Sequence, residues 1–186
     1  MLPPRATLLF LISCALLFPS ESTGQQTQPQ PQPYRSVEAY KVYDAILPLG
    51  WPARTAHAKK LATRSVTAHY TNCLRVGDNQ DKGVDSAVGN YLDLNQEPWL
   101  LEKNFHIDLP YELTSNDDLL TEQNSETGGV IDLSAVGFNA DETVAVVYMG
   151  HNCGLLCGGG GFYVLLKKDG QWHPVKKPMV GCGWVS

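Results

Sequence analysis

The stretch Thr143-Val-Ala-Val-Val-Tyr-Met149, followed by Cys153-Gly-Leu-Leu-Cys157-Gly-Gly-Gly-Gly161, decides how this chain folds. Its first run is apolar at both sets of alternating positions, and a strand that is apolar on both faces belongs in the middle of a sheet. Residues 162–166 have the same property and predict a second central strand. The glycines at positions 158–161 lack side chains, and they predict a bulge or a close approach between backbone segments.

The flanking residues extend these two strands into a β-meander. A strand over 130–138 and a turn at Asn139-Ala-Asp-Glu142 precede them. Asp169-Gly170 predicts a tight hairpin turn after them. The next strand, over 172–175, contains a proline, which has no N–H group to donate to a second neighbour, so we expect it at an edge of the sheet. A last short strand is expected at 184–185.

Helix signals lie in the residues before this meander. They combine apolar residues at helical spacing with a polar N-cap residue or a proline at the start. Four helices are expected. The first begins after Ser36 and ends at Pro48, and the second begins after Asp85. The third begins at Pro98, and the fourth covers 116–123. A strand is expected over 61–72, which is rich in β-branched residues. The fold class that follows is α+β, with helices of the N-terminal half packed on one face of a C-terminal antiparallel β-meander.

Residues 1–24 have the anatomy of a secretory signal peptide. A basic residue comes first, residues 7–18 are apolar, and Ser22-Thr-Gly24 supplies small residues at the spacing of a cleavage site. Residues 25–35 alternate glutamine with proline and predict an extended spacer. Residues 36–186 are then expected to form a single globular domain.

The leader predicts export, and so a location in the periplasm or outside the cell. Leu11-Ile-Ser-Cys14 offers an alternative, because it is compatible with a lipoprotein cleavage site that would tether the chain to a membrane through Cys14. The 186 residues carry a formal charge of −5. A mildly acidic chain lacks the basic surface that attracts nucleic acids and anionic membranes. We therefore expect no nucleic-acid partner, and no membrane contact unless Cys14 is lipidated.

Short motifs across the last third of the chain form a set. They are Val136-Gly-Phe-Asn139, Ala145-Val-Val-Tyr148, Cys153-Gly-Leu-Leu-Cys157-Gly-Gly-Gly160, Leu165-Leu-Lys167, Gly170-Gln-Trp172 and Trp184-Val-Ser186. This set resembles the C-terminal pattern of a group of uncharacterised secreted or lipid-anchored bacterial proteins. The resemblance implies a bacterial, exported, single-domain protein, and it implies no activity.

Four of the five cysteines follow the expected leader, namely Cys73, Cys153, Cys157 and Cys182. In an exported protein they predict two disulfides, for which three connectivities exist. Gly154 and Gly158 permit the tight backbone that a local bridge between Cys153 and Cys157 needs. The resemblance implies that Cys73 pairs with Cys182, because both cysteines depart from the pattern of the group.

Two further hypotheses use the same cysteines. A small ring closed by Cys153 and Cys157 predicts a bridge that exchanges with thiols. Alternatively, His151, Cys153 and Cys157 supply soft ligands for zinc or copper(I), with Cys182 or Cys73 completing the set. The sequence holds no complete catalytic or cofactor motif, and the run Gly158, Gly159, Gly160 and Gly161 lacks the Lys-Ser/Thr ending of a phosphate-binding loop. We therefore expect no cofactor and assign no catalytic residue.

The expected function is that of a non-enzymatic binding or structural domain of the cell envelope or the extracellular space. Its partner is predicted as a protein or a small ligand, without further identity. One alternative is a periplasmic thiol-redox or metal-handling protein centred on Cys153 and Cys157. The other is a small inhibitor or immunity-type protein that blocks a partner enzyme, which the fold class permits without establishing it.

Overall fold

The computed structural model of this chain describes residues 30–50, 60–68, 70–71, 73–79, 81–115, 128–154, 157–176 and 182–185. The expected signal peptide with Cys14 lies outside these residues, as does the expected helix over 116–123. Within them, the last part of the expected spacer takes part in the fold. Strand β1 (Gln32–Pro33) pairs in parallel with β3 (Trp99–Leu100), and Tyr34 is 5% exposed in the core.

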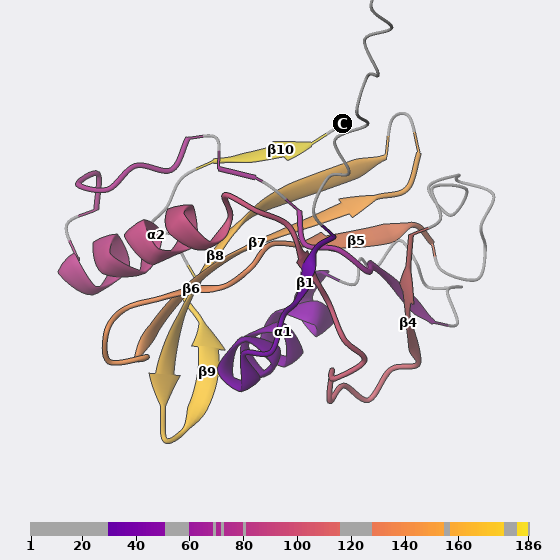
Figure 1. Cartoon of the computed structure of the whole chain (residues 1–186), viewed down its shortest axis with the longest axis horizontal. Coiled ribbons are helices and arrows are strands. Elements are labelled where there is room, and N and C mark those ends of the chain that lie inside the picture. Colours follow the sequence, from indigo (N-terminus) through magenta and orange to yellow (C-terminus); the bar gives the residue numbers. More distant parts are fainter. Residues whose placement is uncertain are drawn as a thin grey trace, which may run out of the picture.

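A mixed sheet of eight strands organises the described residues (Figure 1). Its main path runs β10-β8-β7-β5-β2-β4, while β6 pairs with β7 and β9 pairs with β8. The strands are β2 (Leu61–Arg64), β4 (Tyr111–Thr114), β5 (Val130–Leu133), β6 (Gly137–Phe138), β7 (Val144–Asn152), β8 (Gly158–Lys168), β9 (Gln171–Pro174) and β10 (Gly183–Val185). The two central strands and the hairpin turn at 169–170 are where the sequence predicts them.

The antiparallel meander is only one part of this sheet. Strands β5, β7, β8 and β9 pair antiparallel in succession, whereas β2 pairs in parallel with both β4 and β5. The connection between β2 and β4 is long and contains helix α2 and strand β3, and parallel pairing requires such a long connection. The expected strand over 61–72 is confined to its first four residues.

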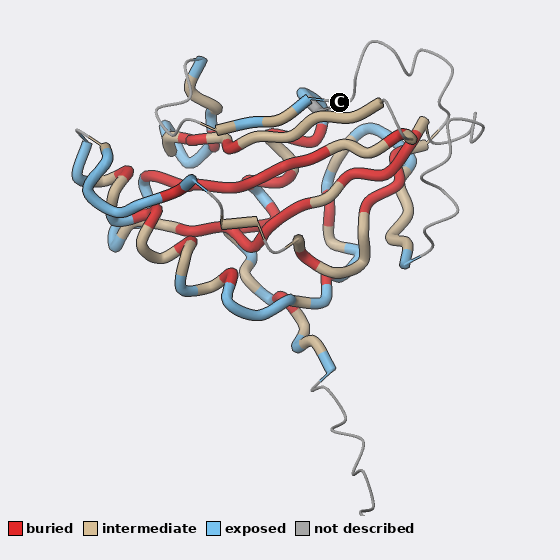
Figure 2. Tube along the Cα trace, turned by 90° about the horizontal axis from the view of Figure 1, so that it is seen from above, coloured by how far each residue is buried: buried red, intermediate tan, exposed pale blue. Residues whose placement is uncertain are grey.

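Two helices, α1 (Val37–Gly50) and α2 (Lys82–Leu94), cover opposite faces of the central strands in the described part of the chain. Tyr43 and Ile46 of α1 share one core cluster with the odd-numbered side chains of β7. Helix α2 shares the other cluster with the even-numbered side chains of β7. The prediction that helices pack on one face is therefore wrong, because a strand that is apolar on both faces needs cover on both. Strand β7 is buried along most of its length, whereas most residues of β8 have intermediate exposure (Figure 2).

The helix boundaries differ in detail from the prediction. Helix α1 begins after Ser36, whose hydroxyl accepts a hydrogen bond from the N–H of Ala39 at 3.2 Å, and it continues past Pro48 to Gly50. The N-cap of α2 is Asp81, which accepts from two backbone N–H groups, rather than Asp85 in the first turn. An aspartate at either place suits a helix start, so the cap geometry decides between them.

The helix expected to begin at Pro98 is absent. The backbone groups of this segment form hydrogen bonds with other segments instead. The N–H of Tyr34 donates to the carbonyl of Leu100 at 2.8 Å, and the N–H of Leu101 donates to the carbonyl of Ser65 at 2.8 Å. These bonds compete directly with the i to i−4 bonds of a helix, and tertiary pairing overrides the local propensity. Phe105 still reaches the core with its side chain, at 6% exposure.

The strand expected over 130–138 is interrupted at residues 134–136, and the side chains of both helices and of the N-terminal segment satisfy the backbone there. Tyr43 of α1 donates to the carbonyl of Ser134 at 2.7 Å. Asn95, at the end of α2, accepts from the N–H of Ala135 at 2.9 Å and donates to its carbonyl at 3.1 Å. Tyr34 accepts from the N–H of Val136 at 2.9 Å.

We expect Asn95→Ala to lower the free energy of unfolding by about 2 kcal/mol, because it leaves the N–H of Ala135 buried without a partner and the carbonyl of Ala135 with the hydroxyl of Ser134 as its remaining donor. Urea unfolding monitored by circular dichroism measures the change. Gln96→Ala is the matched control: the adjacent amide is exposed and bonds within its own helix. Equal effects of the two substitutions would contradict the role given to Asn95.

The carboxylate of Glu38 joins helix α1 to the β8–β9 hairpin. Glu38 accepts hydrogen bonds from Lys167 at 2.8 Å, Lys41 at 2.6 Å and the indole N–H of Trp172 at 3.1 Å. The bond from Lys167, followed by that from Lys41, lowers the pKa of Glu38 to about 2 from its ordinary value of 4.5. The carboxylate is therefore held in its charged form.

This pKa predicts a loss of stability in acid. A depressed folded pKa means that the contribution of Glu38 is complete above about pH 5 and disappears as the pH falls toward 2. We expect Glu38→Gln to reduce the free energy of unfolding by about 1 kcal/mol at pH 6, after allowance for solvent screening. At pH 2.5 the difference between variant and wild type should largely vanish. The same substitution at the exposed Glu97 serves as control, and a pH-independent effect of Glu38→Gln would refute the assignment.

Candidate functional site

The four cysteines of the described residues form two bridges, Cys73–Cys182 and Cys153–Cys157. Their Cα atoms are 6.2 Å and 5.1 Å apart, within the usual range for disulfides. These are the two pairs expected from the sequence and the resemblance. The first ties the segment after β2 to β10 across a sequence separation of 109, and the second closes the connection between β7 and β8.

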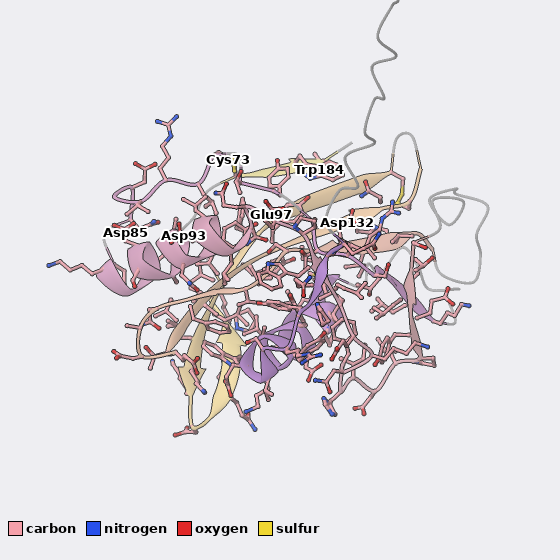
Figure 3. The ribbon with its side chains drawn as sticks, viewed as in Figure 1. Cys73, Asp85, Asp93, Glu97, Asp132 and Trp184 are labelled. Carbon is pink, nitrogen blue, oxygen red and sulfur yellow. A yellow bond between two sulfur atoms is a disulfide. The ribbon has the colours of Figure 1, made fainter. Side chains whose placement is uncertain are left out.

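The glycine run 158–161 lies inside strand β8, paired residue by residue with β7, and so forms no bulge. Its even-numbered members make the expected close approach, with Trp184 of β10 lying over them (Figure 3). A Cβ atom added at Gly160 would lie 2.8 Å from the indole nitrogen of Trp184, and one at Gly158 would lie 3.1 Å from its ring. That nitrogen donates to the hydroxyl of Tyr148 at 2.7 Å. Gly158 and Gly160 are therefore needed by the packing of the fold.

The odd-numbered glycines face the opposite side, and Gly161 has room for a side chain. A Cβ atom added at Gly161 would meet nothing closer than 3.7 Å, whereas one at Gly159 would lie 3.2 Å from the backbone carbonyl oxygen of Trp184. Neither residue has a positive φ, so the backbone would accept other residue types. Internal packing does not explain the glycine at position 161, and the lack of side chains at both positions leaves this face of β8 bare.

This bare face forms the floor of a groove of about 500 Å³. The side chains that wall it come from the end of α1, from β7 and β8, from the residues after β9 and from β10: Leu49, Met149, His151, Tyr163, Val175, Lys176 and Val185. Most are apolar, and the rim is open, because Leu49 is 56% and Val185 90% exposed. A volume of this size falls in the range of small-molecule sites.

His151 lies at the end of the groove, next to the Cys153–Cys157 bridge. Its Nε2 atom is 2.9 Å from the carbonyl oxygen of Gly128, and its Nδ1 atom is 3.7 Å from Sγ of Cys153. Burial lowers the pKa of His151, so the imidazole is neutral at pH 7. The structure thus brings together three of the candidate redox or metal residues: His151, Cys153 and Cys157.

The fourth candidate, Cys182, is not part of this group. It is bonded to Cys73 and packs against the core cluster on the α2 face, whereas His151 follows Met149 on the α1 face. In the described part of the chain, no group of three or more His, Cys, Asp or Glu side chains has the arrangement of a metal site. With its sulfurs in disulfides, the metal set expected from the sequence is not assembled.

Most of the groove is not predicted by the sequence. Tyr163, Val175 and Val185 lie on expected strands that carry no functional role, and Lys176 lies outside the expected elements. The unbroken run of glycines at 158–161 is the available signal. A packing partner on one face of a strand explains the glycines on that face, so the glycines on the other face indicate a second role. His57 and His69, two of the remaining histidines, lie outside the described residues.

No model of a known protein family, no curated protein and no solved structure matches this chain. The resemblance to exported bacterial proteins therefore stays a prediction. Among the described residues, no helix has the length and apolar character required to cross a membrane.

The two sets of glycines should respond differently to substitution. We expect Gly160→Ala to cost about 1–3 kcal/mol of stability, because the added methyl group collides with Trp184 and Tyr148. Gly161→Ala should change stability by less than about 0.5 kcal/mol, since its methyl group enters the groove. Thermal unfolding of the two variants compares them under one condition, and equal destabilisation would show that both faces of β8 are packed.

Proposed function

We propose that this chain is an exported, disulfide-stabilised binding domain that takes a small apolar ligand with an acidic group in the groove above Gly159 and Gly161. The observation that carries the proposal is the alternation along β8. Gly158 and Gly160 are required by Trp184, whereas Gly161 has room for a side chain and lacks one. The bare floor therefore serves something that lies on it.

Export is supported by the leader at residues 1–24 and by the two disulfides, which persist in oxidising compartments such as the periplasm. The resemblance of the C-terminal motifs supports a bacterial origin. The lipoprotein alternative at Cys14 remains compatible with the same domain held at a membrane face. Export, bacterial origin and the membrane tether are all parts of what we propose.

The lining of the groove defines the ligand class. Met149, Tyr163 and Val185 offer apolar surface from three strands, and the glycine floor permits a flat body to contact the backbone. Lys176 adds an exposed cation at the rim, while His151 is neutral. An apolar body with a carboxylate or sulfonate satisfies both features.

The fluorescent probe 8-anilinonaphthalene-1-sulfonate has this chemistry and reports binding directly. We expect the native protein to bind one molecule, and Gly161→Val to weaken the binding at least tenfold, equivalent to about 1.4 kcal/mol, because the side chain fills the floor. A melting curve of Gly161→Val establishes that the fold is kept. Unchanged affinity in that variant would place the probe elsewhere and contradict the groove.

The charge is tested separately. Lys176→Gln should weaken the binding of the sulfonate about threefold, a typical effect of one exposed charge. The exposed Lys168 at the other end of β8 provides the matched control, for which Lys168→Gln should have no effect. If the two variants bind alike, the ligand is apolar without an acidic group and the groove itself still stands.

The alternatives of a metal-handling protein and of an inhibitor or immunity-type protein stay predictions. No contact in the described residues favours either of them over a binding domain.

A further inference from the structure

The Cys153–Cys157 bridge and His151 form a compact group at the end of the groove. The imidazole is fixed between two neighbours: the carbonyl of Gly128, 2.9 Å from Nε2, and Sγ of Cys153, 3.7 Å from Nδ1. Gly129 packs against both residues, since a Cβ atom there would lie 2.8 Å from Nε2 of His151 and 2.8 Å from Cβ of Cys153. The ring is therefore held beside the sulfur by its surroundings.

These contacts determine which nitrogen carries the proton. A carbonyl oxygen only accepts hydrogen bonds, so Nε2 of His151 carries the hydrogen and donates it to Gly128. Nδ1 then presents its lone pair to Sγ of Cys153. A neutral imidazole in this tautomer is a base placed beside a sulfur atom, the arrangement that activates thiols in nucleophilic chemistry.

The two sulfurs differ in access. Cys153 is 6% exposed, whereas Cys157 is only half-buried. An incoming thiol therefore reaches Cys157, and Cys153 is the leaving group next to His151. Exchange of this kind depends on which sulfur is attacked and on how well the departing sulfur is stabilised.

We propose that Cys153–Cys157 is an exchange-competent disulfide that oxidises thiol compounds, with His151 as its proton-transfer residue. This activity goes beyond ligand binding and does not depend on the proposed ligand of the groove. His151 acts as a catalytic residue in this step, because its Nδ1 atom contacts the reacting sulfur.

A thiol R–SH passes its proton through solvent to Nδ1 of His151, and its sulfur attacks Sγ of Cys157 from the side opposite Cys153. The bond between the two cysteines breaks, a mixed disulfide R–S–S–Cys157 forms, and Cys153 leaves as a thiolate that takes the proton from Nδ1. A second thiol R–SH then attacks the mixed disulfide, which gives R–S–S–R and two reduced cysteines. A low-molecular-weight disulfide restores the bridge by the reverse sequence.

The second bridge supplies an internal comparison. Cys73 is exposed, so access alone would favour exchange at Cys73–Cys182 rather than at Cys153–Cys157. Faster exchange at the less exposed bridge would require chemical activation, which the contact between His151 and Cys153 supplies. The same molecule thus carries both the reactive bridge and its reference.

The experiment uses the native, oxidised protein and reduced glutathione as the thiol. Samples are quenched with iodoacetamide at intervals, and peptide mass spectrometry follows each cysteine. We expect Cys153 and Cys157 to become reactive at least tenfold faster than Cys73 and Cys182. His151→Gln, whose amide can still donate to Gly128 but has no basic nitrogen, should slow this exchange at least tenfold, because it removes the proton-transfer group, whose typical contribution is about 10²–10⁴-fold. The exposed His106→Gln should leave it unchanged.

A second variant keeps the test decisive if His151→Gln is poorly folded. Cys157→Ser leaves Cys153 as a free thiol, and its reaction with dithiodipyridine reports the fraction of thiolate. Adding His151→Asn to this variant should slow the reaction at least tenfold. Equal exchange rates for the two bridges, or rates that are independent of His151 in both settings, would overturn the proposal while leaving the binding function untouched.

Discussion

The buried interruption between strands β5 and β6, at residues 134–136, is the constraint on which the rest of this structure depends. A strand that breaks its pairing inside a core exposes backbone groups that water cannot reach, and each unsatisfied group is costly. Here Tyr43 from α1, Asn95 at the end of α2 and Tyr34 from the N-terminal segment satisfy them. These three residues of irregular chain therefore contact both helices, which lie on opposite faces of the sheet, and the segment around Tyr34.

The same sheet gives strand β8 two different roles. On the α2 face, Gly158 and Gly160 make room for Trp184, which bonds to Tyr148 and holds β10 at the edge. On the α1 face, Gly159 and Gly161 leave the floor of a groove uncovered. Because side chains alternate along a strand, a single run of glycines serves packing on one side and an opening on the other.

Local chemistry explains which parts of this fold were predictable. The two-sided apolar pattern of 143–149, the turn at Asp169-Gly170 and the cap at Ser36 are each decided by neighbouring residues, and each is found where expected. The helix expected from Pro98 fails because Leu100 and Leu101 bond to distant segments. For the candidate site, His151, Cys153 and Cys157 were named in advance, whereas Tyr163 and Lys176 come to the groove from positions that carry no local signal.

The sequence by itself determined the central strands, the pairing potential of its cysteines and the presence of helices, since periodicity, turn chemistry and residue type act over short distances along the chain. Tertiary structure alone decided which helix covers which face of the sheet, that β2 joins in parallel, and that Cys182 is separated from His151. It also decided which glycines are covered. These are relations between residues far apart in the chain, fixed by how apolar surface is buried and how the last backbone groups find partners.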